Sequence, residues 1–578
     1  MLKNYHLLPE SPYSTYQAYL EKNGASAILK ARSLSPQAIV DEIQESGLRG
    51  RGGAGFPTAV KWKTVLDHPC VIRYVVCNAA EGEPGTFKDR YLLRRNPYAV
   101  LEGLLIAAHV VGAKTIHIGI KAGFEPEIRR LHQAIHEMRT AGLMSAIDIE
   151  ISPGPGEYLF GEEKALLNQI EAGLPLPREA HYPPYEKGLF SKPGSPNPAL
   201  VNNVETFAHI PSIVLGGAVG FRSIGTADTS GTALYTISGD VNQPGVYELD
   251  AGVPLRRLIY EVAGGPVKGD VKAVLSGFSA GVIAENELET PADFGSLSAI
   301  GSGLGSAGFI VLGSERNMVR VAQAAARFLY VESCNQCPAC KHGLRIASNA
   351  LDGMLDPDRS HVHSVDLALF GARSAPQANR CYLPVQASVL ISSLVHKFKP
   401  DFEAQLTDAR HNPEPFPVPL IGDFDETNRR FIYDDKFAFK NPDWTYNLPA
   451  PIETPVPLWA YLDLRHEIDE LELSELWKSS DRTAKTLVKQ GDLRVVLTLM
   501  KAGAVLKEHK ADGDVTIHVL RGRISINVEQ RALECEQSQM VILNAGVVHS
   551  VEAFEETALL ISISGKRLNK PGSIDHEA

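Results

Sequence analysis

Three cysteines in one short stretch have the spacing of iron–sulfur ligands. Cys334, Cys337 and Cys340 form a C-x2-C-x2-C pattern in ESCNQCPACKHG. Thiolates at this spacing are typical of ligands that wrap one [4Fe–4S] cube, and such a cluster needs a fourth ligand. Cys381 is the plausible candidate, because the helical pattern between it and Cys340 would let a helix pair return the fourth sulfur. The alternative is a structural zinc site, for which two CxxC pairs would be usual.

A glycine-rich cationic loop is the second feature with chemical potential. The stretch Ser46–Trp62 reads SGLRGRGGAGFPTAVKW and contains five glycines. Glycine tolerates positive φ and has no Cβ, so successive backbone amides converge on an anion, and Arg49, Arg51 and Lys61 add charge. A glycine-rich loop is also common on ordinary surfaces, so the phosphate-binding interpretation depends on the neighbouring motifs.

Three polar clusters recur further along the chain, beside turns or at helix starts. They are CNAAEGEPGTFKD with Asn78, Glu81 and Glu83, GPGEYLFGEEKALL with Tyr158, Glu162 and Glu163, and VNNVET with Asn202 and Asn203. Asparagine amides donate and accept hydrogen bonds, which suits a planar heterocycle. Acids in a first helical turn also complement the helix dipole, and an acidic turn also fits a solvated loop.

The elements that would position these motifs begin with an α/β layer. Strand-like runs at Val71–Ala79, Thr115–Ile120 and Ala146–Ser152 alternate with helical patterns, which predicts a doubly wound parallel sheet. The helical patterns are Pro36–Ser46, Ala99–Val111 and Glu125–Thr140. Ligands of such sheets bind beyond the carboxyl ends of the strands, where the CNAAEGEPGTFKD turn is expected.

The rest of the chain changes character several times. Short strands from Thr232 to Gly313 predict a small separate β-rich module, and helical sequence resumes at Asn317. The stretch His411–Leu458 is rich in proline and aromatic residues, which indicates a linker or an arm on a surface. An amphipathic helix is expected at Leu458–Lys478, and the alternation over Gly491–Ser564 predicts a small barrel or jelly roll.

Composition excludes several classes of function. A formal net charge of −11 over 578 residues argues against nucleic-acid binding, which needs a basic face. No apolar run approaches the ~20 residues of a bilayer span, which predicts no membrane insertion. The N-terminus has no signal-peptide pattern, so a cytoplasmic location is expected. Seven cysteines, an odd number, indicate metal or redox use, with Cys70, Cys77 and Cys535 expected as small apolar core residues.

Taken in order, these motifs resemble the FMN-binding flavoprotein subunit of NADH:quinone oxidoreductase (complex I) and the related diaphorase subunits of NAD-linked formate dehydrogenases and hydrogenases. The resemblance covers roughly residues 30 to 405 and includes GLRGRGGAGFPT, GEYLFGEE, VNNVET, ESCxxCxxC and RCYLPVQ. It implies a multidomain α/β chain. The expected parts are a Rossmann-like FMN and nucleotide-binding domain at 1–231, a β-grasp (SLBB-like) module at 232–316, a helical bundle with a [4Fe–4S] cluster at 317–410, a proline-rich linker or arm at 411–480 and an all-β cupin-like barrel at 481–578.

The resemblance also assigns residues to cofactors. FMN contacts are implied for Gly50, Arg51, Gly52, Lys61, Asn78, Glu81, Tyr158, Gly161, Glu162, Asn202, Asn203 and Thr206. Phe56, Glu83 and Glu163 would face NAD(H) or NADP(H), and Tyr185 would inherit an aromatic stacking role. No catalytic side chain is expected, because hydride transfer is the chemistry of FMN itself. The implied partners are a thioredoxin-like [2Fe–2S] subunit and a larger iron–sulfur or catalytic subunit.

Departures from the family pattern fall on the nucleotide side. Ala80 stands where the family has aspartate, and Ala180–Tyr185 replaces a Lys-Pro-Pro-Phe-Pro loop. Two functions therefore stay open. One is an NAD(P)H-linked electron-transfer subunit, and the other is an electron-relay or assembly subunit with an altered nucleotide site.

The C-terminal alternation resembles cupins. His509 and His549 keep two of the four usual metal-ligand positions, and Ala511 and Val515 occupy the other two. The glycines of the two cupin motifs are Gly503, Gly522 and Gly546. Since two neutral nitrogens rarely hold a catalytic metal, docking, dimerisation or ligand sensing is the expected role, with a weakly bound metal as the alternative.

Overall fold

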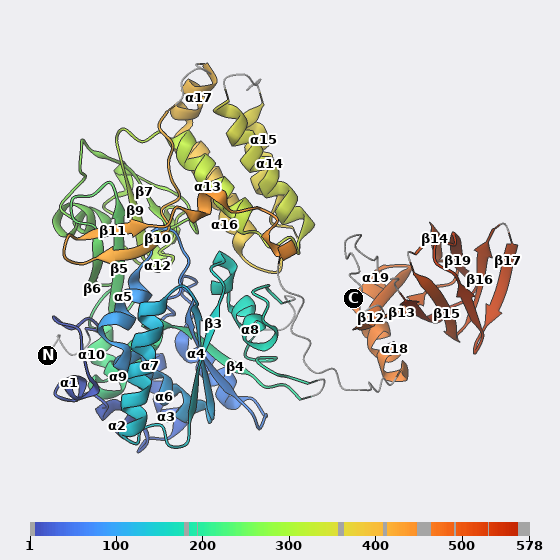
Figure 1. Cartoon of the computed structure of the whole chain (residues 1–578), viewed down its shortest axis with the longest axis horizontal. Coiled ribbons are helices and arrows are strands. Elements are labelled where there is room, and N and C mark those ends of the chain that lie inside the picture. The colour runs from blue at the N-terminus through green and yellow to red at the C-terminus, as the bar shows by residue number, and fades with distance from the viewer. Residues whose placement is uncertain are drawn as a thin grey trace, which may run out of the picture. The chain divides into compact units, whose positions relative to one another are not determined.

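The computed structural model describes residues 6–22, 24–178, 184–192, 195–356, 363–377, 379–407, 413–447, 464–490, 493–511, 513–529 and 531–564. The chain folds into two compact units, Met1–Thr454 and Pro455–Ala578, whose elements are labelled in Figure 1. Each unit has its own core.

A four-stranded parallel sheet organises the N-terminal part of the first unit. Its strands are β1 (Tyr74–Ala79), β2 (Thr115–Lys121), β3 (Asp148–Gly154) and β4 (Ala199–Asn203), in the order β3-β2-β1-β4. Asn78 of β1 pairs in register with Asn203 of β4, so two of the predicted polar motifs meet at the carboxyl edge of the sheet. The predicted parallel α/β sheet is confirmed.

Helices cover both faces of this sheet because alternate strand residues point to opposite sides. Val75 and Cys77 belong to the core formed with α6 and its neighbours, whereas Val76 and Val201 pack with α8. The helices are α1 (Tyr16–Leu20), α2 (Ser26–Ala31), α3 (Pro36–Ser46), α4 (Thr58–Asp67), α5 (Lys88–Arg95), α6 (Pro97–Val111), α7 (Glu125–Thr140), the 3-10 helix η2 (Tyr158–Gly161), α8 (Glu163–Ala172), α9 (Val204–Gly216) and α10 (Ala218–Arg222).

One glycine permits the closest helix contact in this layer. A Cβ on Gly103 of α6 would lie 2.0 Å from the carbonyl oxygen of Phe207 in α9, so only glycine lets the two helices cross at this distance.

The β-rich region begins at Thr232 and has a sheet of order β6-β5-β9-β7-β8. Its elements are β5 (Thr232–Gly239), β6 (Gly245–Asp250), α11 (Leu255–Arg257), η3 (Leu258–Val262), β7 (Val271–Ser276), β8 (Ile283–Ala284), η4 (Glu285–Glu287), α12 (Phe294–Ala299) and β9 (Gly308–Gly313). It has its own core, but it is not separate in space. The backbone N–H of Leu234 donates to Glu205 of α9 at 3.0 Å, which joins it to the parallel-sheet layer.

The helices that follow share one hydrophobic core. They are α13 (Met318–Glu332), α14 (Pro338–Met354), α15 (Ser364–Ser374), α16 (Leu383–Lys397) and α17 (Lys399–Thr407). Cys340 lies in the first turn of α14, and Cys381 lies just before α16, so the helix pair α14–α15 returns the chain to the first three cysteines.

The proline-rich segment folds back onto the first unit over its described part, residues 413–447. It contains β10 (Ile421–Asp425), β11 (Arg430–Tyr433), η5 (Lys436–Phe439) and η6 (Trp444–Asn447). Phe424 and Phe431 join the core of the parallel-sheet layer, and Phe437 and Trp444 join the core of the helices. This part of the segment is therefore an arm packed on the unit that precedes it.

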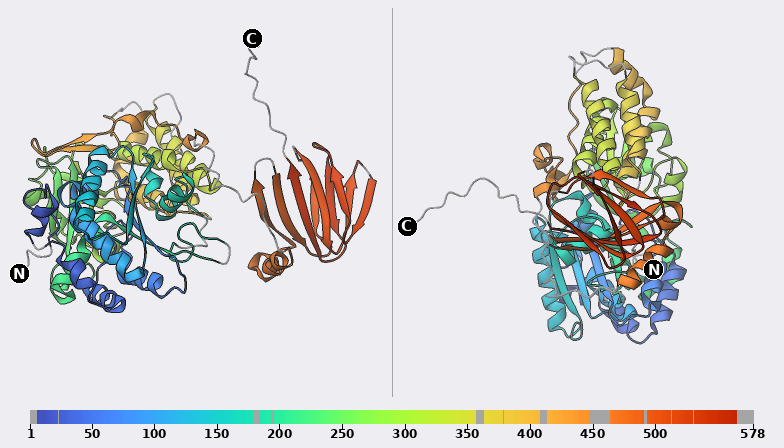
Figure 2. Two further views of the ribbon diagram at one scale, coloured as in Figure 1. Left: turned by 60° about the horizontal axis from the view of Figure 1, so that its bottom comes forward. Right: turned by 90° about the vertical axis from the view of Figure 1, so that its right-hand side faces the viewer.

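Over its described residues, the second unit consists of short helices and two antiparallel sheets (Figure 2). The sheets have the orders β12-β13-β20-β15-β18 and β14-β19-β16-β17, and residues of both enclose one apolar core. The elements are α18 (Leu464–Leu473), α19 (Glu475–Ser479), β12 (Arg482–Gln490), β13 (Leu493–Met500), β14 (Val505–His509), β15 (Asp514–Arg521), β16 (Arg523–Val528), β17 (Arg531–Glu536), β18 (Met540–Leu543), β19 (His549–Ala553) and β20 (Thr557–Ser564). The predicted start of the amphipathic helix, before residue 464, lies outside the described residues.

The three cysteines outside the predicted iron–sulfur site were expected to be buried core residues. Cys77 and Cys535 are buried as predicted, but Cys70 is only half-buried because it lies in the loop between α4 and β1. Within the described ranges, no helix combines the length and the apolar character that crossing a bilayer requires.

Candidate functional site

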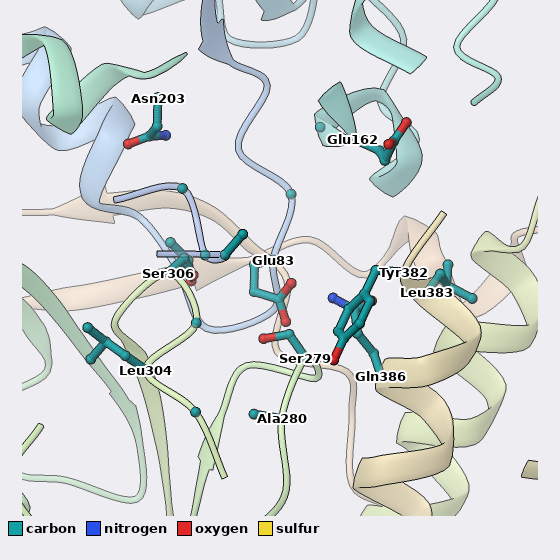
Figure 3. A pocket seen from close by; sticks show the side chains of 18 of the residues that line it. Glu83, Glu162, Asn203, Ser279, Ala280, Leu304, Ser306, Tyr382, Leu383 and Gln386 are labelled. Atoms are coloured by element: carbon teal, nitrogen blue, oxygen red, sulfur yellow. The ribbon is translucent and has the colours of Figure 1, made fainter. Parts of the chain in front are cut away.

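A cavity of about 880 Å³ lies beyond the carboxyl ends of β1 and β4. The glycine loop, the turn after β1, η2 and Asn203 line one part of it, and loops of the β-rich region and α16 line the rest (Figure 3). The predicted residues that reach it are Gly52, Asn78, Glu81, Glu83, Tyr158, Gly161, Glu162, Asn203 and Cys381. The predicted flavin motifs therefore converge.

The two asparagines at the sheet edge are held by their own hydrogen bonds. The Asn78 side-chain amide donates to the Gly161 carbonyl at 2.8 Å. The Asn203 amide donates to Asp89 at 2.6 Å, and its carbonyl accepts from Lys88 at 3.1 Å. Both amides are thus oriented before any ligand arrives.

A cluster of buried charged residues lies next to Asn203 at the carboxyl edge of the sheet. The Lys88 ammonium lies 2.7 Å from Asp89 and 2.8 Å from Glu205, and the three side chains are almost fully buried. Burial raises the pKa of Asp89 to about 6 against the pull of Lys88. Although burial opposes it, the attraction of Lys88 brings the pKa of Glu205 down to about 2. The lysine is therefore the charge that keeps this cluster ionised.

Glu83 lines the cavity and lies next to Ser279 in Figure 3. Its carboxylate accepts hydrogen bonds from the Tyr158 hydroxyl and from the backbone N–H of Phe278, both at 2.6 Å. Burial raises the pKa of Glu83 to about 7, although the Tyr158 bond works in the opposite direction. This carboxyl can change its protonation state near neutral pH.

Glu162 is the second carboxyl of the cavity with a raised pKa. Its side chain accepts from the backbone N–H of Ala165 at 2.8 Å and so caps α8. Burial brings the pKa of Glu162 to about 7. Acidic groups with such values in a cavity are common at functional sites.

Several residues assigned by resemblance lie behind the cavity surface. Lys61 pairs with Glu163 at 2.6 Å, and the Trp62 indole N–H donates to Asn202 at 3.0 Å. Tyr185 packs against the hydrophobic core of the parallel-sheet layer. Those that do not line the cavity are Gly50, Arg51, Phe56, Lys61, Glu163, Tyr185, Asn202 and Thr206. Of the Ala180–Tyr185 loop, residues 180–183 lie outside the described residues.

Arg51 has unused hydrogen-bonding capacity. Its backbone N–H donates to Thr206 Oγ1 at 2.9 Å, and its guanidinium donates to the carbonyl of Ser230 at 2.6 Å. Its Nε and Nη1 groups are buried and have no hydrogen-bond partner among the residues that the structure describes. A buried donor without an acceptor is costly, so this guanidinium is suited to an anion that would complete its contacts.

Residues of the β-rich region in the cavity wall were not anticipated from the sequence. They include Ser279, Ala280, Phe294, Ser298 and the loop 301–306, and α16 adds Tyr382 and Gln386. The glycine- and serine-rich stretch GSGLGS could have indicated them. It was given no role because the β-rich module was expected to be separate. The Thr86 and Ser306 hydroxyls, 2.8 Å apart, tie this loop to the turn after β1.

The four cysteines meet at a second, smaller cavity. Cys334, Cys337, Cys340 and Cys381 line it together. Burial and the neighbouring thiols raise the pKa of Cys340 to about 12. In the described part of the chain, no three His, Cys, Asp or Glu side chains converge closely enough for a single metal ion.

The two cavities share part of their walls. Leu159 of η2 and Cys381 line both of them. A redox group in the large cavity would therefore be next to Cys381, which also lines the smaller cavity with the other three cysteines.

In the second unit, the two predicted histidines are neighbours. The rings of His509 and His549 lie 4.4 Å apart between centroids, on paired strands β14 and β19. Nδ1 of His549 lies 3.0 Å from the carbonyl of Val547. Over the described ranges, no third metal-ligating side chain joins them.

Comparisons with known proteins agree with the site. The Nuo51 FMN-binding domain matches residues 43–212, the SLBB domain matches 234–277, and the NADH-ubiquinone oxidoreductase-F iron-sulfur binding region matches 320–405.

Named relatives and a solved structure extend this likeness. An NADH-quinone oxidoreductase F-type chain of Rhizobium meliloti is 42% identical over 60% of this chain and 82% of that protein. The NADP-reducing hydrogenase subunit HndC of Solidesulfovibrio fructosivorans is 36% identical over 58% of this chain and 69% of that protein. The crystal structure of an NAD+-reducing [NiFe]-hydrogenase in the H2-reduced state is similar with a TM-score of 0.61 and 31% identity, over 70% of this chain and 68% of that chain.

With three matched regions in chain order and cysteines that meet at one cavity, the chain belongs to the family of NADH-quinone oxidoreductase F subunits and related hydrogenase diaphorase subunits.

Proposed function

We propose that this chain is the NAD(P)H-linked electron-transfer subunit of a multi-subunit oxidoreductase, in which electrons pass between nicotinamide nucleotide, FMN and a [4Fe–4S] cluster. The observation that carries the proposal is the shared wall of the two cavities, formed by Leu159 and Cys381. Family membership agrees with this chemistry, because the relatives are named as NADH-quinone oxidoreductase and hydrogenase subunits.

The large cavity fits FMN by the chemistry of its lining. Gly52 leaves room at the sheet edge, since a Cβ there would lie 3.2 Å from the Cβ of Asn203. Asn78 and Asn203 line the cavity and present fixed amides. When bound, FMN supplies the ability to accept a hydride and to release electrons singly. Of the twelve residues that the resemblance implies, we assign to it the seven that line the cavity, which are Gly52, Asn78, Glu81, Tyr158, Gly161, Glu162 and Asn203.

The protein side of the reaction is positioning. Glu83, held by Tyr158 and Phe278, presents to the cavity a carboxyl whose pKa burial raises to about 7. Its side chain would orient the nucleotide, whereas Phe56 and Glu163, which the resemblance also assigns to the nucleotide, do not line this cavity. Ser279 and Gln386 line the same cavity.

The four cysteines fit an iron–sulfur cluster by donor type and number. Cys334, Cys337, Cys340 and Cys381 supply the four thiolates that such a cluster uses. We assign all four as its ligands. Leu159 of η2 and Cys381 line this smaller cavity and also the large one.

The finer fold assignments belong to the same proposal. We assign a Rossmann-like domain to residues 1–231, a β-grasp fold to 232–316, a helical iron–sulfur domain to 317–410 and a cupin-like barrel to 481–578. A thioredoxin-like [2Fe–2S] subunit and a larger iron–sulfur subunit are the proposed partners, since the relatives are named as subunits of larger enzymes. A cytoplasmic location stays a prediction.

Anaerobic titration of the purified holo-complex tests the function. NADH or NADPH should bleach the flavin absorption band and then reduce the iron–sulfur centre. Replacing Cys381 with serine should lower the iron content, whereas Cys70→Ser, at a half-buried loop position, should leave it unchanged. If neither NADH nor NADPH bleached the flavin band, the proposed nucleotide-linked function would be wrong.

A second candidate is an electron relay with an altered nucleotide site. It is favoured by Ala80, which lines the cavity where the family has aspartate, and by Phe56, Glu163 and Tyr185, which do not reach it. In this case a chemical reductant would reduce flavin and cluster, while neither NADH nor NADPH would do so.

A further inference from the structure

The segment 413–447 lies beyond residue 405, where the matched iron–sulfur region ends. We call it the strap. It contacts the parallel-sheet layer at β10 and β11 and the helices at η5 and η6. The first unit therefore contains an element that joins its flavin and cysteine regions from outside the matched parts.

The β10–β11 end of the strap contacts the turn that carries Glu83 and the helix α5 that follows it. The backbone N–H of Gly85 donates to the Pro419 carbonyl at 2.8 Å, and Arg90 donates to the Gly422 carbonyl at 3.1 Å. Arg94 of α5 pairs with Asp423 at 2.7 Å. The rings of Phe424 and Phe431 lie 6.3 and 6.0 Å from Phe87, between centroids. This end is fixed by backbone bonds, charge and aromatic packing.

The other end fixes the loop of the first three cysteines. The Trp444 indole N–H donates to the Val331 carbonyl at 2.9 Å, and the ring is 6% exposed. Asn335, which follows Cys334 with φ of +62°, donates its amide to Thr445 Oγ1 at 2.8 Å. Lys341 donates to the Pro442 carbonyl. The strap thus contacts the chain on both sides of Cys334.

Lys440 links the cysteine loop to the flavin cavity. Its ammonium lies 2.7 and 2.8 Å from the two carboxylate oxygens of Glu332, which is almost fully buried. Glu332 also accepts the backbone N–H of Tyr158 at 3.0 Å. The Lys440 ammonium therefore stabilises the carboxylate of Glu332, the last residue of α13. That carboxylate in turn binds the first backbone N–H of η2.

We propose that the strap is a positioning element of the electron-transfer site and that Lys440 is its principal positioning residue. Through Glu332 it fixes η2, which separates the two cavities, and it offsets a negative charge two residues before Cys334. Hydrogen bonds and net charge around a cluster set its reduction potential, and residues outside the ligand set commonly tune it. The inference rests on the proposed function.

The test uses the full-length holoprotein and three variants. Lys440→Met should shift the cluster midpoint potential to more negative values, because Glu332 then lacks its cation, and should speed iron release to a chelator several-fold. Lys440→Arg should restore both values, since it keeps the charge. Lys399→Met is the matched control, because this lysine is 72% exposed and pairs only with Glu403 on its own helix among its described ion pairs.

A second variant covers the case in which Lys440→Met fails to fold. Thr445→Val removes the acceptor of the Asn335 amide and should also speed iron release, while Thr445→Ser should not. Wild-type potential and iron release in both Lys440→Met and Thr445→Val would overturn the inference. A wild-type chain that holds no iron would instead overturn the proposed function, so the two failures are distinguishable.

Discussion

The Tyr158 hydroxyl donates a 2.6 Å hydrogen bond to the Glu83 carboxylate. The bond joins η2 to the turn after β1, and Glu83 accepts a second bond from Phe278 of the β-rich region. Three segments that are distant in sequence therefore meet at one carboxyl group.

Tyr158→Phe should raise the pKa of Glu83 further, because burial already raises it to about 7 and the lost hydrogen bond had lowered it. The pH profile of flavin reduction by NADH should then move to higher pH, with its midpoint above its wild-type position. Stopped-flow measurements over roughly pH 6 to 9 would show the shift, given that one pKa unit corresponds to about 1.4 kcal/mol. Tyr260→Phe is the control, and equal profiles in all three proteins would contradict the role of this bond.

Lys61→Gln should weaken FMN binding by about tenfold, which corresponds to about 1.4 kcal/mol of added electrostatic repulsion. Without Lys61, the Glu163 carboxylate would be left unneutralised beside the glycine loop and would repel a phosphate. Lys63→Gln is the matched control on the same helix, since Lys63 pairs with Asp67 in an exposed position. Fluorescence titration of the flavin-free protein measures both dissociation constants, and similar values would exclude an electrostatic role for Lys61.

Lys88→Met should destabilise the first unit by about 3 to 5 kcal/mol, because it leaves buried carboxylates without their cation. The lysine is 1% exposed and contacts both Asp89 and Glu205. Lys268→Met removes an exposed partner of Glu315 and should cost at most about 1 kcal/mol. Urea unfolding curves compare the stability of the two variants with that of the wild type. Equal midpoints for Lys88→Met and the wild type would show that the buried carboxylates do not need the Lys88 charge.

The flavin-free protein should lose stability as the pH rises from about 5 to 7. Burial raises the pKa values of Glu83 and Glu162 to about 7 in the folded chain, from an ordinary value of 4.5. Between those values the folded state binds more protons than the unfolded state, so raising the pH favours unfolding, by at most roughly 7 kcal/mol for the two groups together. The effect levels off above pH 7.

Unfolding midpoints measured at several pH values test this dependence. Glu83→Gln with Glu162→Gln should flatten the curve, whereas Glu289→Gln, at an exposed position, should leave its slope unchanged. If the variant with both substitutions kept the wild-type change of unfolding midpoint with pH, groups other than Glu83 and Glu162 would cause the pH dependence.

Local patterns were sufficient for much of the fold. The helix Glu125–Thr140 begins and ends where its periodicity predicts, and β1, β2 and β3 lie within a few residues of the predicted strands. The fourth strand of the parallel sheet, β4, was not predicted. These elements depend on side-chain alternation and helix caps, which neighbouring residues determine. The role of the β-rich region could not be found in this way, because GSGLGS becomes a cavity wall only through contacts with Thr86 and the glycine loop.

By itself, the sequence determined the chemistry of this protein: the four cysteines, the glycine loop and the paired asparagines are recognisable from residue type and spacing. Only the tertiary structure decided that Cys381 and Leu159 face both cavities, that Lys61 pairs with Glu163, and that residues 413–447 pack as a strap. The physical reason is that cavities and ion pairs form between segments that are hundreds of residues apart. Their geometry depends on how whole layers pack, and no local pattern encodes it.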